Sequence, residues 1–189
     1  MKTRQFILIL LVIISPGKLK AQDIPPPNPG LVINIVSGYS IEFVFDEIDE
    51  YIYGIGTAGQ STFIRIGAIT DWKLQFKADQ VMFYGTSNPS NQMELNNVGV
   101  VVVSLGTNLD DGTNIINNAK MAPVALESTD ITLLTKGTLS NKGYGIENTF
   151  TLNWEMGTMN GNMNPVRMLD QDLAADTYTL NIVLTLSTY

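Results

Sequence analysis

The 189-residue chain has no cysteine and no histidine, and basic residues are scarce, with 11 Lys and Arg against 18 Asp and Glu. Without cysteine and histidine, the usual zinc sites cannot be built. A Ser-His-Asp triad, a cysteine nucleophile and an iron–sulfur centre are excluded as well. Acid–base catalysis would have to rely on carboxylates, lysine or tyrosine, and no spacing of these residues indicates a reaction. We therefore predict that the protein is not an enzyme.

Residues 1–22 have the layout of a secretory signal peptide. Two basic residues precede nine consecutive apolar residues at 6–14, and a Ser-Pro-Gly break follows. A nine-residue helix is only about 14 Å long, half of a bilayer core, so we expect no transmembrane segment after processing. The expected cleavage lies after Ala21 or Gln22. The sequence thus predicts export to the periplasm, the cell surface or the medium.

Removal of the leader makes the chain more acidic, because the leader carries four basic residues and no acidic ones: Lys2, Arg4, Lys18 and Lys20. Seven basic residues then stand against 18 acidic residues, a net charge of −11. Such a surface repels nucleic acid and anionic lipid, so neither is an expected partner. The expected partners are other surface proteins or like subunits, with glycans as a further class.

After a proline-rich lead-in at residues 23–30, apolar residues alternate with a period near two through residues 31–189. The C-terminus is the clearest case, where one face holds Tyr178, Leu180, Ile182, Leu184 and Leu186. Turn clusters rich in Gly, Asn and Pro separate these runs. The pattern predicts one all-β domain, a single immunoglobulin-like antiparallel β-sandwich of seven to ten strands with little helix.

Local patterns add expectations about particular residues. Trp72 and Trp154 are in phase with apolar stripes, which predicts core positions. Tyr178 begins a strand after a turn, as in a tyrosine corner. Residues 113–126 have partial helical spacing that Pro123 would interrupt, so a short helix stays one alternative there. A helical turn is a second candidate at residues 169–174.

Three stretches resemble bacterial surface β-sandwich proteins of the pilin, spore-coat-U-like and WxL-like types. They are LAADTYTLNIVLTL at residues 173–186, IGAITDWKLQFKA at 66–78 and DEYIYGI at 49–55. The resemblance implies an immunoglobulin-like sandwich in an extracellular assembly or adhesive layer. The chain lacks the disulfide of most chaperone–usher pilins. The strand expected after residue 30 is the better candidate for exchange with a neighbouring subunit, although pairing within its own sheet is the general expectation.

Carboxylates are concentrated at Asp46, Glu47, Asp49 and Glu50, and crowded oxygen ligands suit Ca²⁺. Residues 108–114 form a second candidate loop, and Asp170 with Asp172 a weaker pair. Solvation of acidic loops is the commoner explanation in a chain this acidic. Four methionines lie between residues 156 and 168. Thioether ligands suit Cu(I), whereas packing beneath a loop is the commoner role.

Tyr51, Tyr53 and Tyr144 lie beside glycine-rich turns and are candidate sugar contacts. The leading hypothesis is an exported, non-enzymatic structural or adhesive cell-surface protein, with a fimbrial-type subunit as its specific form. The alternative is a secreted carbohydrate-binding module that uses exposed tyrosines and Ca²⁺. A hydrolase acting through two carboxylates is a third class, although no spacing selects a pair.

Overall fold

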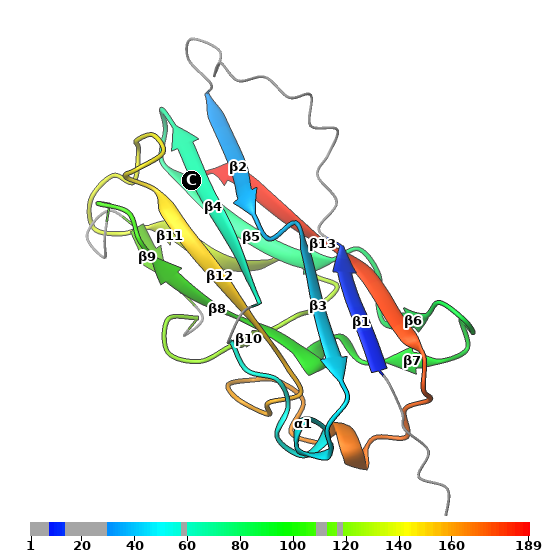
Figure 1. The fold of residues 1–189 in the computed structure, drawn as a ribbon. Helices are drawn as coiled ribbons and strands as arrows, with labels where there is room; N and C mark the ends of the chain where they lie inside the picture. Colours follow the sequence, from blue (N-terminus) through cyan, green and yellow to red (C-terminus); the bar gives the residue numbers. More distant parts are fainter. Residues whose placement is uncertain (1–7, 14–29, 58–59, 109–112, 117–118) are drawn as a thin grey trace, which may run out of the picture.

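The computed structural model describes residues 8–13, 30–57, 60–108, 113–116 and 119–189. Most of the predicted leader, residues 23–29 of the lead-in and the acidic residues 110–111 of the second candidate loop therefore lie outside the described residues. Strands account for 48% and helices for 8% of the structure. Two sheets pack as a sandwich, so the predicted all-β fold with little helix is confirmed (Figure 1).

The first sheet has the order β3-β1-β13-β5-β11-β9, and the short strands β6 and β7 extend it beside β13. Its strands are β1 (Leu8–Ile13), β3 (Ser40–Phe45), β5 (Trp72–Ala78), β6 (Phe83–Gly85), β7 (Gln92–Met93), β9 (Thr113–Ile115), β11 (Ile131–Lys136) and β13 (Thr177–Thr188). Every pairing in this sheet is antiparallel except that of β1 with β13.

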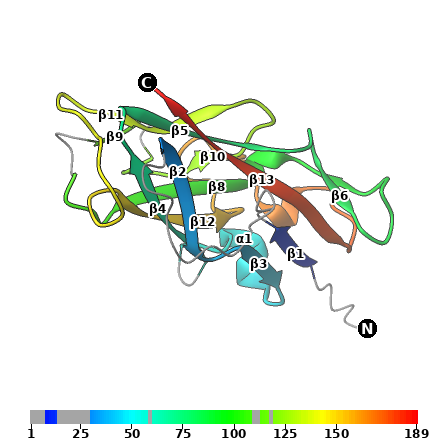
Figure 2. The same cartoon turned by 90° about the horizontal axis from the view of Figure 1, so that it is seen from above.

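The second sheet has the order β10-β8-β12-β4-β2 and is antiparallel throughout. Its strands are β2 (Leu31–Ser37), β4 (Ser61–Ala68), β8 (Val98–Ser104), β10 (Val124–Ala125) and β12 (Thr149–Met156). The two sheets hold thirteen described strands, more than the seven to ten we predicted, because several are ladders of only two or three residues. Seen from above, the two layers lie face to face (Figure 2).

The core fills the space between the sheets with the inward residues of the alternating strands. Both tryptophans are fully buried, which confirms the prediction for Trp72 and Trp154. Trp72 meets Phe150 edge to face with ring centroids 6.0 Å apart, and Phe76 tilts toward Trp154 at 6.4 Å. Such aromatic pairs add to the stabilisation from burial alone.

The two halves of the C-terminal strand β13 pair with different strands of the first sheet. Its first half pairs with β1 and β6, and its second half pairs with β5. Tyr178 is fully buried and its hydroxyl donates to the carbonyl oxygen of Ala174 at 2.8 Å, so the expected tyrosine corner is present. Burial raises the pKa of the Tyr178 phenol, which keeps this donor protonated.

The helical content differs from the sequence-based expectations. The described parts of residues 113–126 form β9 and β10, each paired with a strand, and contain no helix. Near the second expected helical turn lies the 3₁₀ helix η2 (Met168–Asp170); another, η1 (Leu95–Asn97), precedes β8. The short helix α1 (Ile48–Tyr53) was not predicted. The described parts of residues 113–126 form strands because their backbone pairs with neighbouring strands. The spacing of apolar residues does not reveal such pairing.

Candidate functional site

The most unusual feature of the fold is the position of β1 between β3 and β13 (Figures 1 and 2). Residues 8–13 belong to the apolar run of the predicted leader. They pair antiparallel with β3 from Leu8–Phe45 to Ile13–Ser40, and parallel with β13 from Ile9–Thr177 to Ile13–Asn181. We call the space that β1 occupies the leader slot, with β3 and β13 as its walls.

The walls of the leader slot carry large buried side chains at alternate positions. Ile41, Phe43 and Phe45 of β3 are at most 2% exposed, as are Tyr178 and Leu180 of β13. The intervening residues of β3 point outward and are exposed. A strand in the slot therefore meets core residues at every second position and solvent-facing residues at the others.

Among the described residues, β1 is the only strand that pairs with β3. The wall is also held in other ways. The backbone N–H of Glu42 donates to the side-chain oxygen of Gln60 at 3.3 Å, and the carbonyl of Phe45 accepts the hydroxyl of Tyr51 at 3.0 Å. The Tyr51 ring packs on Phe45 with centroids 5.2 Å apart. β3 is thus also held by contacts that do not involve β1.

The four residues predicted to bind a metal follow β3 directly, at the start of α1. Asp46, Glu47 and Asp49 are exposed, and Glu50 is half-buried. The Glu50 carboxylate accepts the backbone N–H groups of Asp46 at 2.7 Å and Glu47 at 3.1 Å. This is a helix-capping arrangement, which explains why α1 begins here. Within the described ranges no three acidic side chains converge to hold a metal ion, and calcium binding stays a prediction.

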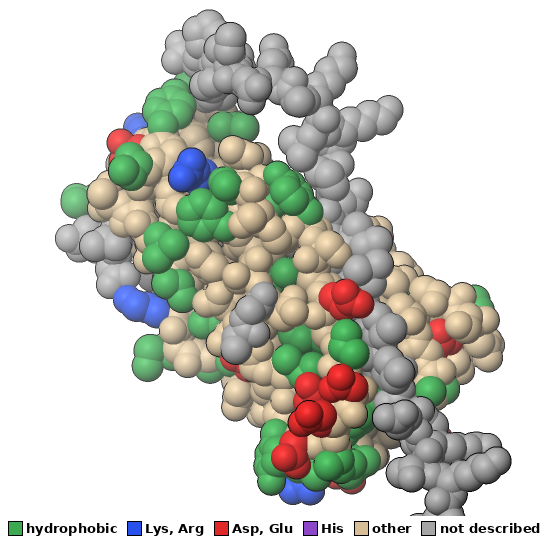
Figure 3. Space-filling view, in the orientation of Figure 1, with side chains coloured by type: hydrophobic (Ala, Val, Ile, Leu, Met, Phe, Trp, Pro, Cys, Tyr) green, Lys and Arg blue, Asp and Glu red, His purple; other side chains and the backbone are tan. Residues whose placement is uncertain are grey.

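Figure 3 shows acidic side chains gathered over β3 and α1. Besides the residues of the helix start, this region includes Glu42, which is exposed on the outward face of β3. We call Glu42, Asp46, Glu47 and Asp49 the acidic flank of the leader slot. Its charge favours basic groups beside the slot and repels acidic ones.

The structure does not bring the three candidate sugar-binding tyrosines together. Tyr51 and Tyr53 lie on α1, which joins the Met156 end of β12 through the bridge of Ile55. Tyr144 lies in the loop at the other end of β12, an eight-residue strand about 23 Å long. Tyr51 is half-buried with its hydroxyl bonded, whereas Tyr53 is 67% and Tyr144 is 45% exposed. Only the last two offer open faces.

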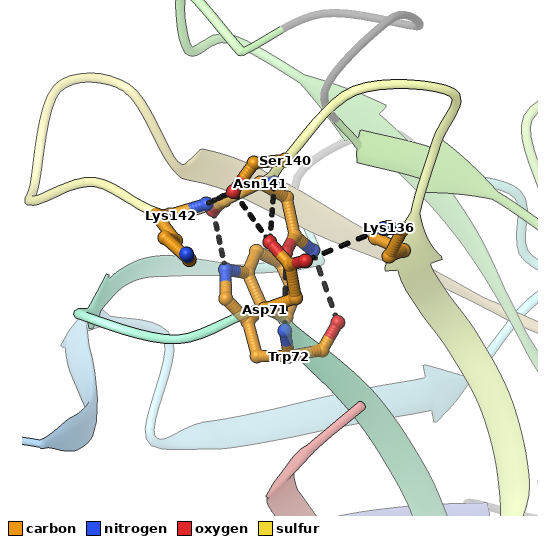
Figure 4. A network of polar contacts seen from close by, with 6 residues as sticks. All are labelled: Asp71, Trp72, Lys136, Ser140, Asn141 and Lys142. Carbon is orange, nitrogen blue, oxygen red and sulfur yellow. Dashed lines mark hydrogen bonds and ion pairs between the residues drawn. The ribbon is translucent and has the colours of Figure 1, made fainter.

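The loop before β12 is fixed by a buried polar network around Trp72 (Figure 4). Asn141 is fully buried, and its side chain accepts the backbone N–H of Trp72 and donates to the Trp72 carbonyl, both at 3.0 Å. The Asn141 carbonyl accepts the indole N–H of Trp72 at 2.7 Å. Asp71 binds Ser140 and the Lys136 ammonium, and the Ser140 hydrogen bond is the main cause that lowers the pKa of Asp71. These contacts fix the loop before β12 to the start of β5, so we assign them a structural role.

A buried acid, Asp176, organises the turn between β6 and β7. It accepts the backbone N–H groups of Ser87 and Asn88, each at 3.0 Å, and that of Thr177 at 2.7 Å. The Asn91 amide adds a bond at 2.9 Å. Hydrogen bonding to the charged form, led by the Ser87 N–H, lowers the pKa of Asp176 strongly. This arrangement positions the first residues of β13, and therefore one wall of the leader slot.

Three of the four methionines between residues 156 and 168 are buried, and the fourth, Met159, is half-buried. Met156, Met163 and Met168 are at most 5% exposed. A Cβ at Gly99 would lie 2.7 Å from the Met163 sulfur, and one at Gly157 would lie 2.5 Å from Met168. The two glycines thus make room for these side chains, which supports the packing role.

Neither the leader slot nor the buried Asn141 and Asp176 was identified from the sequence. The slot arises from pairing between segments far apart in the chain, which leaves no spacing signal. Asp176 had a weak sequence signal, because it precedes the Thr-Tyr-Thr that begins the alternating terminal strand.

Fold and site thus define a two-sheet β-sandwich in which β1 fills a slot between the edge strand β3 and β13. No helix within the described residues is long and apolar enough to span a membrane. No family model matches the chain, and no curated protein is similar to it.

Proposed function

We propose that the protein is an exported, non-enzymatic structural or adhesive component of the cell surface that assembles as a fimbrial-type subunit. The observation that carries the proposal is the pairing of residues 8–13 within the leader slot. A signal peptidase that removed residues 1–22 would also remove a strand from the sheet. The edges of β3 and β13 would then lack partners, and an unpaired edge favours pairing with another chain.

The charge of the processed chain agrees with this role. Its net charge of −11 favours solubility outside the cell. The domain has no disulfide and is stabilised in part by the hydrogen bonds of Trp72, Asn141 and Asp176. A core of this size is expected to be stable without a disulfide. The resemblance of residues 173–186 to pilin-type surface proteins points to the same class.

Expression of the whole chain in a bacterium with two membranes tests the proposal. We expect the mature protein to begin at Gln22 or Asp23 by mass spectrometry and to occur in high-mass material sheared from the cell surface. The variant Leu10→Arg/Val12→Arg interrupts the apolar run and should retain the chain in the cytoplasm. A wild-type chain that keeps residues 1–13 and stays in the cytoplasm would contradict the proposal.

Carbohydrate binding is the second candidate, and the exposed rings of Tyr53 and Tyr144 favour it. On a glycan array with and without Ca²⁺, Tyr53→Ala or Tyr144→Ala should abolish the binding of a sugar ligand. Tyr189→Ala is the matched control, because Tyr189 is 71% exposed. Equal binding by all variants would remove this candidate. Calorimetric titration with Ca²⁺ tests the predicted role of Asp46 and Glu47 directly.

A further inference from the structure

We propose that Asn160 is a site of spontaneous modification in the folded protein. The backbone nitrogen of Gly161 displaces the side-chain amide of Asn160, and water converts the product to aspartate or isoaspartate. The reaction loosens the loop at residues 157–165, which follows β12. This inference is independent of the proposed function and of the removal of the leader.

The sequence singles out this asparagine. Asn160-Gly161 is the only Asn-Gly pair in the chain. In the reaction, the backbone nitrogen of the following residue approaches the side-chain carbonyl carbon of the asparagine. Glycine has no Cβ that would hinder this approach. Asn164, in the same loop, precedes Pro165, whose nitrogen carries no hydrogen. Of these two asparagines, only Asn160 therefore has an unhindered nucleophile beside it.

The structure leaves the reacting groups of Asn160 and Gly161 accessible. Both residues are exposed. Within the part of the chain that the structure describes, the backbone N–H of Gly161 donates no hydrogen bond, whereas that of Met163 donates to the Asn160 carbonyl at 3.1 Å. A cavity of about 540 Å³ is lined in part by Gly161 and Asn162, so water reaches this point of the backbone. The N–H that must react is thus free, and the N–H that follows Asn162 is not.

The reaction balances with water as the only other reactant. The Gly161 nitrogen forms a bond to Cγ of Asn160, and the bond between Cγ and Nδ2 breaks. The leaving Nδ2 group takes the proton of the Gly161 N–H and departs as ammonia, which leaves a five-membered cyclic imide. Water then opens the imide at one of its two carbonyl groups. Opening at Cγ gives aspartate, and opening at the main-chain carbonyl gives isoaspartate, whose backbone is one atom longer.

The backbone around Asn160 has little tolerance for change. Gly157, Met159 and Gly161 have φ values of 66°, 60° and 60°. Met159 is the one residue other than glycine with a positive φ in the described ranges, and a side chain disfavours this conformation. Such a conformation persists only where the surrounding contacts enforce it. The loop therefore depends on the contacts at its tip.

The first of these contacts joins Asn160 to a buried acid. The Asn160 amide donates to the carboxylate of Glu155 at 3.2 Å, and Glu155 is 7% exposed. The other described donor to this carboxylate is the Thr158 hydroxyl at 2.7 Å, and no basic side chain among the described residues pairs with it. A carboxylate at position 160 replaces a hydrogen-bond donor with a like charge. The modified residue is therefore repelled by Glu155.

The second contact involves the two residues after Asn160. A Cβ at Gly161 would collide with the carbonyl oxygen of Pro123, so the backbone is closely packed there. The side-chain oxygen of Asn162 accepts the backbone N–H of Ala125 in β10 at 2.8 Å. The extra backbone atom of isoaspartate displaces both residues. The modification thus weakens the attachment of β10, an edge strand of the second sheet.

Incubation of the purified whole chain in mildly alkaline buffer tests the site. Trypsin then releases residues 143–167 as one peptide, because Lys142 and Arg167 bound this segment and no basic residue lies within it. Fragmentation mass spectrometry locates a gain of about 1 Da, since an NH₂ group is replaced by OH. An isoaspartate-specific methyltransferase measures the second product.

We expect Asn160 in the folded chain to gain this mass at least about tenfold faster than Asn162, because the nucleophile after Asn160 is unhindered and free. The variant Asn160→Gln keeps a side-chain amide but would need a six-membered ring, and it should show no gain over the same period. A mass gain at Asn160 that occurs only in urea-unfolded chain would overturn the proposal. Equal rates at Asn160 and Asn162 in the folded chain would overturn it as well.

The variant Asn160→Asp reproduces the aspartate product and tests the loosening of the loop. At pH 7 its melting temperature should lie about 2–8 °C below that of the wild type, because a hydrogen bond is lost and a like charge is added. The matched control Asn160→Ala removes the donor without adding a charge and should lower the melting temperature less. A melting temperature of Asn160→Asp equal to that of the wild type, or no lower than that of Asn160→Ala, would refute the loosening by charge repulsion.

Discussion

Asn141 connects the loop before β12 to the backbone of Trp72, and the substitution Asn141→Ala tests how much this connection contributes to stability. The change removes two side-chain hydrogen bonds from a fully buried residue. The N–H and carbonyl of Trp72 then lose these partners, and each unsatisfied buried group costs about 1–3 kcal/mol. We expect the free energy of unfolding to fall by about 2–5 kcal/mol, a large share of the stability of an ordinary domain.

Urea unfolding followed by tryptophan fluorescence measures this loss. The matched control is Asn88→Ala, because Asn88 is exposed and its side-chain oxygen accepts only the backbone N–H of Ser90 at 3.1 Å among its described contacts. The control should change stability by about 0.5 kcal/mol or less. Equal losses in the two variants would refute the reasoning that Asn141 holds the backbone of Trp72.

The variant Asn141→Asp adds a pH-dependent measurement to the same test. It keeps the shape of the side chain and the acceptor for the Trp72 N–H, but an ionised carboxylate cannot donate to the Trp72 carbonyl. Burial should raise the pKa of the new carboxyl group. Stability should therefore be lowest at neutral pH and recover relative to wild type as the pH falls through the raised pKa. A pH-independent loss would contradict this account.

Two further substitutions test the start of β13. Because hydrogen bonds lower the pKa of Asp176, its ionised form stabilises the fold fully above the ordinary carboxyl pKa near 4. Asp176→Asn should lower the melting temperature at pH 7. The difference in melting temperature from wild type should shrink as the pH falls below about 5 toward the folded pKa of Asp176. A difference that stays constant with pH would speak against this role. Tyr178→Phe leaves the Ala174 carbonyl without its donor and should cost about 1 kcal/mol by urea unfolding, and no loss would show that the bond contributes nothing net.

The period-two pattern was sufficient to predict the class of fold. Trp72, Trp154 and Tyr178 occupy the buried positions predicted from their phase with apolar neighbours. Local alternation is a reliable guide here because a strand with one buried face must alternate whatever its partner. The same reasoning could not predict the partner of each strand. Thr113–Ile115 became a strand because β11 lies beside it, which its own residues do not encode.

The candidate site depended even more on distant contacts. Crowding of Asp46, Glu47, Asp49 and Glu50 was visible in the sequence, but the use of Glu50 as a helix cap was not recognised. The leader slot is formed by residues 40–45 and 177–181, which are more than 130 positions apart. No periodicity reports such a pairing, because side-chain alternation says which face is buried and not which edge is open.

The sequence by itself determined that this chain forms strands with one apolar face. It also carries the pattern of an apolar leader, followed by a chain with an excess of acidic residues. These are properties of single segments, set by backbone geometry and the transfer of apolar side chains from water. Only the tertiary structure decided that residues 8–13 lie between β3 and β13. That placement depends on two walls brought together by the rest of the sandwich, and it exists only after the long-range pairing has formed.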